Sequence, residues 1–449
     1  METSSVKAEG RNPKGERKPK SEGRRLARRA GTAEDRLSGF FAVFVALSLT
    51  AAAALGGQVA RLPSSREQVS LDAGWKFARG DMSGAEQPGF NDAAWRCLNL
   101  PHDWSIEGPF AETNRTGGAG GFLPAGVGWY RKALTLPAAY AQRRVFIDFD
   151  GVMANSEMWV NGFHLGRRPY GYVSFRYELT GHLRFGDGKT NLLAVRVDNA
   201  GQPASRWYAG AGIYRHVRLV ATDPVHLDQW GPFVTTPQVN SNQAVIRVQT
   251  TVLNQSSEPR TVTVASSILA PDGQLVQRAE SQSQMLAPGK SALFQQESTL
   301  ERPQLWDVVS PIAGSSSFAP QPLYRLATKV QSANGTLDES LTAFGLREAR
   351  FEAATGFWLN GKNLKLKGVC LHHDAGGLGA AVPLGAWERR LELLRQIGCN
   401  AIRTAHNPVA PEFLDLCDRM GFLVMDELFD CWTVGKNRYD YHLYYNEWS

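Results

Sequence analysis

Three apolar segments near the C-terminus constrain the fold of this chain most. Between Leu364 and Asp430 the sequence contains KLKGVCLHHD, CNAIRTAHNP and GFLVMDELFD, and each apolar run ends in polar or ionisable residues. Segments with helical periodicity separate the three runs. Short apolar strands that alternate with helices predict a βαβαβ unit with parallel strands.

Two amphipathic helices are predicted between these strands. The first covers about residues 387–397 and ends at Gly398, and the second begins at Pro411 and ends at Gly421. Proline suits the first turn of a helix, and glycine suits the left-handed residue after its last turn. The expected apolar faces comprise Trp387, Leu391 and Leu394 in the first helix and Phe413, Leu414, Cys417 and Met420 in the second. One apolar stripe per helix is typical of an outer helix that lies on barrel strands.

The candidate functional site lies at the ends of the three predicted strands. Parallel sheets bind ligands beyond the carboxyl ends of their strands. The side chains expected there are His372, His373, Asp374, Arg403, His406, Asn407, Asp426 and Glu427. Their imidazole, guanidinium and carboxylate groups suit hydrogen bonding to a polar substrate.

The chain before this unit is predicted to be β-structure. Runs such as VFIDFDG, EMWVNG and NLLAVRVDN alternate apolar and polar residues and end at turn residues, which predicts a β jelly-roll sandwich over residues 61–222. Residues 223–338 show the pattern of an immunoglobulin-like β-sandwich without paired cysteines. Residues 339–449 then form the barrel region. Asn161-Gly162 and Asn360-Gly361 predict tight hairpins, because Asn-Gly accepts positive φ at both positions.

Three loops of the predicted jelly roll contain aromatic residues beside charged groups, and the second and third also contain glycine: LPHDW, GVGWYRK and DNAGQPASRWYAGAGIYR. Aromatic faces pack against the C–H groups of sugars, and glycine lets the backbone approach a ligand. A sugar-binding role is therefore open for Trp104, Trp129, Trp207 and Tyr214. Packing in the core is the simpler explanation for each one alone.

Charge is concentrated at the N-terminus. Residues 1–38 contain eleven Lys or Arg and six acidic residues, so they carry most of the net charge of +6. The remainder is nearly neutral, which argues against nucleic-acid binding by the folded body. The basic head is followed by an uncharged apolar run, Phe40 to Leu55, and by small residues. Residues 1–60 are thus expected to be a basic head with an export signal or, alternatively, a membrane anchor, and the body to be periplasmic or extracellular.

The five cysteines are Cys97, Cys370, Cys399, Cys417 and Cys431. They are too few and too irregularly spaced for a disulfide framework, and no pair has metal-finger spacing. Four of them occur singly at apolar positions of the barrel region. We therefore expect free, buried thiols.

The order and spacing of several motifs resemble glycoside hydrolase family 2, in particular its bacterial β-galactosidase-like members. The motifs are HDW, GWYRK, SRWY with GAGIYR, KGVCLHHD, NAIRTAHNP and MDELFDCW, within about residues 69–449. The resemblance implies a jelly-roll sugar-binding domain, an immunoglobulin-like domain and a TIM (β/α)8 barrel. A whole barrel needs about 250 residues. Only about 85 follow Leu364, so the first three or so βα units are expected.

The resemblance also implies roles for individual residues. Arg403 matches the arginine that pairs with the catalytic nucleophile, since a planar guanidinium suits a carboxylate. His372 and His406 match rim histidines that donate to sugar hydroxyls and to charge in the transition state. The other residues expected to support binding or catalysis are Asp198, Asn407, Asp426 and Glu427. LFDCW replaces the acidic and histidine ligands of the family's magnesium site, so no metal or other cofactor is assigned.

The resemblance implies hydrolysis of terminal β-glycosides with retention, which uses two carboxyl groups about 5 to 5.5 Å apart. In the family these lie on the fourth strand and a later one, so both are expected beyond Ser449. Asn446-Glu447 imitates the first, but it follows YDYHLYY rather than an apolar strand. We expect Glu447 to be an exposed residue. The predicted function is a retaining β-galactosidase, with this chain an inactive fragment.

Two alternatives remain open from the sequence. One is a non-catalytic carbohydrate-binding protein. The other is a β-glucuronidase or another β-glycosidase, because the sugar specificity depends on residues that the motifs do not include. In each case the expected partner is a carbohydrate.

Overall fold

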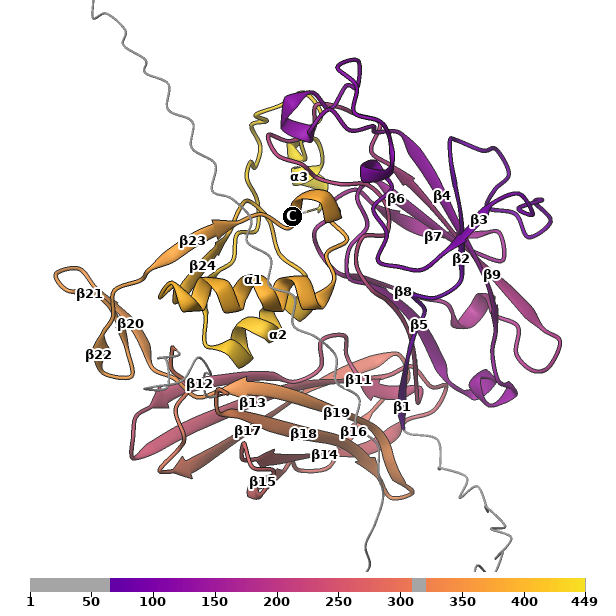
Figure 1. Cartoon of the computed structure of the whole chain (residues 1–449). Helices are drawn as coiled ribbons and strands as arrows, with labels where there is room; N and C mark the ends of the chain where they lie inside the picture. Colours follow the sequence, from indigo (N-terminus) through magenta and orange to yellow (C-terminus); the bar gives the residue numbers. More distant parts are fainter. Residues whose placement is uncertain (1–64, 309–319, 449) are drawn as a thin grey trace, which may run out of the picture. The chain divides into compact units, whose positions relative to one another are not determined.

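The structure is a computed structural model that describes residues 65–308 and 320–448 (Figure 1). The predicted head with an export signal or anchor, residues 1–60, lies outside the described residues. Among the helices that are described, none is long and apolar enough to cross a membrane. The predicted fold class is confirmed, because two β-sandwiches precede three parallel strands with their helices.

The first region is a jelly-roll sandwich of two antiparallel sheets. One sheet has the order β1 (Arg66–Ser70), β10 (Val217–Thr222), β5 (Arg144–Phe149), β8 (Phe175–Glu178). The other has the order β3 (Arg96–Leu98), β2 (Trp75–Arg79), β4 (Val127–Thr135), β9 (Thr190–Asp198), β6 (Ser156–Val160), β7 (Phe163–Arg168). Alternate residues of β5 and β9 form the core, namely Val145, Ile147, Phe149, Leu193, Val195 and Val197.

The second region is the predicted immunoglobulin-like sandwich. In one sheet β13 (Gln243–Asn254) pairs with β11 (Val225–Leu227), β12 (Phe233–Val239) and β17 (Lys290–Glu301). The other contains β15 (Leu275–Glu280), β14 (Arg260–Leu269), β18 (Leu323–Ser332) and β19 (Gly335–Gly345), and β16 (Gln284–Leu286) pairs with β14. Pairing of β18 with β19 continues to Gly345. The sandwich therefore extends past residue 338, where the sequence pattern placed its end.

A small antiparallel sheet leads into the barrel region. It contains β20 (Ala349–Glu352), β21 (Gly356–Leu359) and β22 (Lys362–Asn363). Asn360 and Gly361 join β21 to β22 with φ values of 49° and 75°. Asn161 and Gly162 join β6 to β7 in the same way, with φ values of 51° and 85°. Both predicted Asn-Gly hairpins are thus confirmed.

The barrel region contains the predicted βαβαβ unit. Its parallel strands are β23 (Gly368–Leu371), β24 (Ala401–Thr404) and β25 (Leu423–Met425), in that order. The connecting helices α1 (Leu384–Gln396) and α2 (Pro411–Met420) lie near the strands in Figure 1, and α3 (His442–Trp448) follows β25. Gly398 and Gly421 both have positive φ, as expected after a helix end.

The apolar faces of the two helices form one core with the strands. Trp387 and Leu391 of α1 pack with Phe413 and Cys417 of α2 and with Ile402 of β24. The predicted faces need one adjustment. Leu414 is only half-buried, whereas Leu416, which the sequence pattern did not include, is buried.

The expectation of buried thiols is wrong for two of the five cysteines. Cys399, Cys417 and Cys431 are free and buried, whereas Cys97 and Cys370 are free and exposed. Cys97 lies on β3, the edge strand of its sheet. Cys370 lies on β23 beside Arg403, with 3.4 Å between its Sγ atom and an Arg403 nitrogen.

A buried carboxylate joins the first sandwich to the barrel region. Asp103 of the HDW motif is 3% exposed. Its Oδ1 atom accepts hydrogen bonds from the backbone N–H groups of Ser105 and Ala211 (3.0 and 2.9 Å), and its Oδ2 atom accepts from the Tyr208 hydroxyl (2.6 Å) and the Ala380 N–H (2.8 Å). The motif that suggested a sugar site is therefore a structural anchor.

Two glycines make this close approach possible. A Cβ atom on Gly379 would lie 2.5 Å from Asp103 Oδ2, and one on Gly210 would lie 2.9 Å from it. Both residues also have positive φ, which side chains rarely adopt. One of these glycines belongs to the sandwich and the other to the barrel region, so both surfaces are shaped for the same carboxylate.

A buried histidine lies at the same junction. His373 Nε2 is 3.1 Å from the carbonyl oxygen of Ala209, and because a carbonyl only accepts, this nitrogen carries the hydrogen. The imidazole packs edge-on against Tyr172 and Tyr214. The other ring nitrogen, Nδ1, is buried and has no hydrogen-bond partner among the described residues.

We expect Asp103→Asn to lower the free energy of unfolding by about 3 kcal/mol, because an amide group would face donors that need an acceptor. Urea denaturation at neutral pH measures the change. Asp81→Asn is the matched control: this carboxylate is exposed and pairs with Arg196, so its loss should cost less than about 1 kcal/mol. Equal effects of the two substitutions would contradict the anchoring role.

We expect stability to fall in weak acid because of His373. Burial lowers the pKa of His373 from 6.5 to about 4, with Arg215 and His372 adding to this and Asp374 opposing it. The unfolded chain therefore binds the proton first, so the stabilisation is complete above pH 6.5 and is lost as the pH falls toward 4. The loss should reach up to about 3 kcal/mol.

Urea denaturation at several pH values, compared with the variant His373→Gln, isolates this contribution. Glutamine keeps a donor for the Ala209 carbonyl but does not titrate. The stability difference between the two proteins should shrink from pH 7 to pH 4. A constant difference would show that His373 does not respond to pH.

Candidate functional site

The strand ends bring Arg403 and Glu427 together. Arg403 ends β24 next to Thr404, and Glu427 follows β25. Arg403 Nε donates to Glu427 Oε1 at 2.6 Å, and the Glu427 backbone N–H donates to the Thr404 hydroxyl at 2.9 Å. Two neighbouring parallel strands thus hold the guanidinium and the carboxylate in one place.

His406 faces two carboxylates and an indole. Its Nδ1 atom lies 3.3 Å from Asp430 Oδ1 and 3.7 Å from Glu427 Oε2. The ring of Trp207, from the first sandwich, is tilted by 33° against it, with 4.6 Å between ring centroids. Burial lowers the pKa of His406, although Asp430 and Glu427 oppose the shift. His406 is therefore neutral near pH 7.

His372 completes this group of rings. Its ring centroid lies 5.3 Å from that of His406 and 6.2 Å from that of Trp207. Its Nδ1 atom is buried and has no hydrogen-bond partner among the described residues. The structure therefore places the two predicted rim histidines side by side, with an aromatic wall from another domain.

Asp430 is the site residue that the sequence did not single out. Arg206 of the first sandwich donates to both of its carboxylate oxygens, at 2.7 and 2.8 Å, and Lys436 Nζ donates at 2.9 Å. Burial opposes ionisation, but these hydrogen bonds hold the pKa of Asp430 below its ordinary value. Asp430 directly follows DELF, the residues after the third predicted strand. Its role becomes visible only through its partners, one of which, Arg206, lies more than 200 residues earlier in the chain.

Two other predicted residues have supporting positions. Asp426 is exposed, and its Oδ1 atom accepts from the Thr404 hydroxyl at 2.7 Å. Asn407 is buried, at 1% exposure, and neither atom of its amide has a hydrogen-bond partner among the described residues. Asp426 therefore holds the end of β24, while the contacts of Asn407 give it no role at the described wall.

The structure does not bring Asp198 to this group. Its carboxylate is 3.2 Å from an Arg196 nitrogen and accepts the Ala200 backbone N–H at 3.0 Å. None of its described contacts is with His372, Arg403 or His406. β9 ends at Asp198, and the carboxylate turns back along its own strand instead of toward the barrel.

Glu447 lies in α3, where it is exposed. It therefore does not follow a barrel strand. The expectation that Glu447 is exposed is confirmed.

The aromatic loops have different positions. Trp104, Trp129, Trp207 and Tyr214 are all buried. Of these four, only Trp207 has a described ring contact with His372 and His406, whereas Tyr214 contacts His373. Its Nε1 atom donates to the Tyr172 hydroxyl at 3.0 Å, which fixes the indole in the plane that faces His406.

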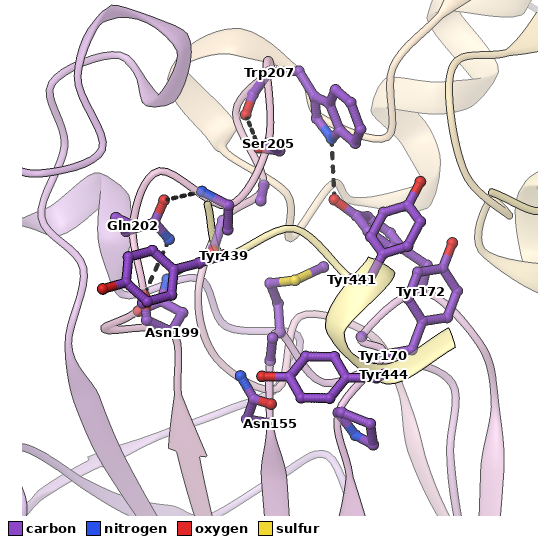
Figure 2. Close-up of a pocket in the computed structure, with 18 residues that line it drawn as sticks. Asn155, Tyr170, Tyr172, Asn199, Gln202, Ser205, Trp207, Tyr439, Tyr441 and Tyr444 are labelled. Atoms are coloured by element: carbon purple, nitrogen blue, oxygen red, sulfur yellow. Dashed lines mark hydrogen bonds between the residues drawn. The ribbon is translucent and has the colours of Figure 1, made fainter. Parts of the chain in front are cut away.

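A cavity beside Trp207 lies between loops of the first sandwich and the segment around α3 (Figure 2). Its volume is about 90 Å³, below the 300 Å³ or more that is usual for ligand sites. The amides of Asn155, Asn199 and Gln202 in its wall are bonded to other protein groups. It is therefore a packing space at the junction and not the sugar site.

One group of three side chains in the described residues could share a cation: Cys431, Asp440 and His442. It does not include Asp426 or Glu427. Cys431 belongs to the LFDCW segment, and Asp440 and His442 lie beyond it.

The arrangement suits binding of an uncharged polyol. Two imidazoles, a guanidinium held by a carboxylate and an indole surface line one side of the site. Each carboxylate at the strand ends is already engaged: Asp374 with the backbone N–H of Gly376, Asp426 with Thr404, Glu427 with Arg403, and Asp430 with Arg206 and Lys436. For Asp430 the hydrogen bonds also hold the pKa below its ordinary value, the opposite of what a proton-donating carboxyl group needs.

Comparison with known proteins agrees with this arrangement. Three family models match the chain in series. The model for the sugar binding domain of glycosyl hydrolases family 2 matches residues 122–223, and the model described as glycosyl hydrolases family 2 matches residues 225–347. The model for the TIM barrel domain of this family matches residues 353–439. A β-galactosidase from Bacteroides ovatus is 49% identical over 387 residues, which cover 86% of this chain and 44% of that protein.

Solved structures give the same result. A family 2 glycosyl hydrolase from Bacteroides cellulosilyticus superposes with a TM-score of 0.79 at 39% identity, over 85% of this chain and 48% of that one. A β-glucuronidase from Bacteroides uniformis gives a TM-score of 0.73 at 30% identity, over 83% and 43% of the two chains. The chain spans less than half the length of each of these relatives. With its three domains matched in series and its strand-end residues in place, the chain belongs to glycoside hydrolase family 2.

Proposed function

We propose that the protein hydrolyses terminal β-galactosides with retention, and that the described strand ends form the wall that positions the sugar. The observation that supports this most is the joint wall of His372, His406 and Trp207 beside the Arg403–Glu427 pair. The similarity to the Bacteroides ovatus β-galactosidase favours galactose over other sugars.

Arg403 has a planar group available for a further carboxylate. One of its nitrogens, Nε, is used by Glu427, and the side chain is 39% exposed. A guanidinium binds a carboxylate well and keeps it ionised. This supports a role in which Arg403 holds the nucleophile of the reaction in its charged form.

His406 has a more specific role than a hydrogen-bond donor. Both carboxylates near Nδ1 can only accept, so Nδ1 carries the hydrogen of the neutral ring. Nε2 then has a lone pair and accepts a hydrogen bond from a sugar hydroxyl. This differs from the donor role that the family resemblance implied, and the cause is the pair of acids behind the ring.

We infer that the two carboxyl groups that break the glycosidic bond are not among the described residues. Retention needs an acid and a nucleophile about 5 to 5.5 Å apart on either side of that bond. The strand-end carboxylates are held by other protein groups, and Glu447 is exposed on α3. The described residues supply binding and orientation only.

The 449-residue chain should not release nitrophenol from an aryl β-galactoside. A longer protein that also contains the further barrel strands should release it. A chromogenic assay of both proteins measures this. Glu447→Gln in the active form should leave turnover within about twofold of the parent, because the residue lies outside the site. If the 449-residue chain hydrolyses the substrate and Glu447→Gln abolishes this activity, the assignment is contradicted.

The pKa of His406 tests the arrangement of His406, Trp207 and Asp430 without an activity assay. Trp207→Ala should raise it toward the ordinary value, because burial lowers it. Asp430→Asn should lower it further, because Asp430 favours the charged ring. NMR titration of the His406 ring protons gives both shifts, and Trp129→Phe, in a separate cluster with Trp159, should change nothing. Shifts of the same sign for the first two variants would contradict the geometry.

A β-glucuronidase is the second candidate, because a relative with that name shares the fold. A glucuronide carries a carboxylate, which needs a cation that is not already paired. Arg206 is held by Asp430, and the part of the Arg403 guanidinium that Glu427 leaves open is assigned to the nucleophile, so the described wall favours a neutral sugar. Aryl β-glucuronide should therefore be the poorer substrate of the active form.

We also propose that the protein works outside the cytoplasm. The basic head and the apolar run from Phe40 to Leu55 support an export signal or an anchor. Cell fractionation of a tagged protein, with and without residues 1–60, distinguishes export from retention in the cytoplasm.

A further inference from the structure

The segment between β25 and α3 folds back on itself. Cys431 stands near its start, and Asp440 and His442 stand near its end. One ligand atom of each residue lies within 4.8 Å of the other two. Cys431 and Asp440 are buried, and His442 is half-buried.

The contacts of the three side chains leave a place for a shared partner. Cys431 Sγ lies 2.7 Å from Asp440 Oδ1, and the backbone N–H of His442 also bonds to this sulfur. The second carboxylate oxygen of Asp440 accepts the Lys436 backbone N–H at 3.1 Å. His442 Nδ1 is buried and has no hydrogen-bond partner among the described residues.

Gly435 makes room for the imidazole. A Cβ atom at this position would lie 2.3 Å from His442 Nδ1. The backbone of Gly435 does not have positive φ, so glycine is needed here for space and not for conformation. The loop is therefore shaped to hold the ring against the thiol and the carboxylate.

We propose that Cys431, Asp440 and His442 bind a zinc ion. A thiolate, a carboxylate and an imidazole are a ligand set that favours Zn²⁺, whereas Mg²⁺ and Ca²⁺ prefer oxygen ligands. The thiolate and the carboxylate together balance the charge of the ion. On binding, the Cys431 thiol loses its proton to solvent, and a sulfur–zinc bond replaces the hydrogen bond to Asp440. Ligand atoms around tetrahedral zinc are about 3.5 Å apart. Cys431 Sγ and Asp440 Oδ1, at 2.7 Å, must therefore separate by about 1 Å, and any pair as far apart as 4.8 Å must approach by a similar amount.

The ion would hold the loop that faces the first sandwich. Within this loop Tyr441 accepts the Cys431 backbone N–H at 3.2 Å and packs on Tyr170 of the sandwich. Lys436 does not compete for the site, because its ammonium group binds Asp430. The inference does not depend on glycosidase activity. Cys431 lies in the LFDCW segment, which by the family resemblance replaces the magnesium ligands, whereas Asp440 and His442 lie beyond that segment.

Cobalt titration of the reduced, chelator-treated protein tests the site. A thiolate ligand gives Co²⁺ an intense charge-transfer absorption in the near ultraviolet, and Zn²⁺ should remove it at one equivalent. Cys431→Ser should abolish the absorption and weaken Zn²⁺ binding at least about 100-fold, because a hydroxyl is a poor zinc ligand. His442→Gln should weaken binding at least about tenfold. Zn²⁺ should also raise the unfolding temperature of the parent protein.

Cys97→Ser is the matched control, because Cys97 is an exposed free thiol on β3. This variant should bind both metals like the parent. No charge-transfer absorption in the parent, or binding that Cys431→Ser and His442→Gln leave unchanged, would overturn the proposal. If Cys431→Ser does not fold, the parent spectrum and His442→Gln decide the question.

Discussion

The buried carboxylate of Asp103 is the interaction on which the site depends. It accepts hydrogen bonds from N–H groups in its own loop, in the loop that precedes β10 and in the barrel region. An ionisable group in such a place is stable only when each acceptor position is filled. Gly210 and Gly379 let the backbones come close enough to fill them. The loop that contains Trp207 is thereby fixed against the strand ends of the barrel region.

The site wall is consequently a product of two domains. β23, β24 and the segment after β25 supply His372, Arg403, His406 and Glu427, and the sandwich supplies Trp207 and Arg206. Asp430 connects the two sets, since it accepts from Arg206 and lies next to His406. The charged groups of this wall form pairs with one another, Arg206 with Asp430 and Arg403 with Glu427. The imidazoles of His372 and His406 then remain available for hydrogen bonds with sugar hydroxyls.

The sequence predicted what is local or periodic. The helix stripe of Trp387 and Leu391, the glycine after each helix and the Asn-Gly hairpins follow from spacing and conformational preference. The positions of Arg403 and Glu427 follow from the rule that parallel strands end at one edge. Predictions that needed contacts across the fold were weaker. Asp198 turns to Arg196, Cys370 is exposed, and Asp430 was not singled out, because each depends on a neighbour that is distant in sequence.

By itself, the sequence determined the three-part architecture, the family and the strand-end chemistry of the candidate site, since alternation, helical period and motif order need no knowledge of distant contacts. Only the tertiary structure decided what those residues do. It showed that the HDW motif anchors one domain to another, that His406 has its Nδ1 atom against acids, and that Cys431 meets Asp440 and His442. The physical reason is that hydrogen bonds, burial and ligand geometry depend on distances in space, which residue spacing along the chain does not specify.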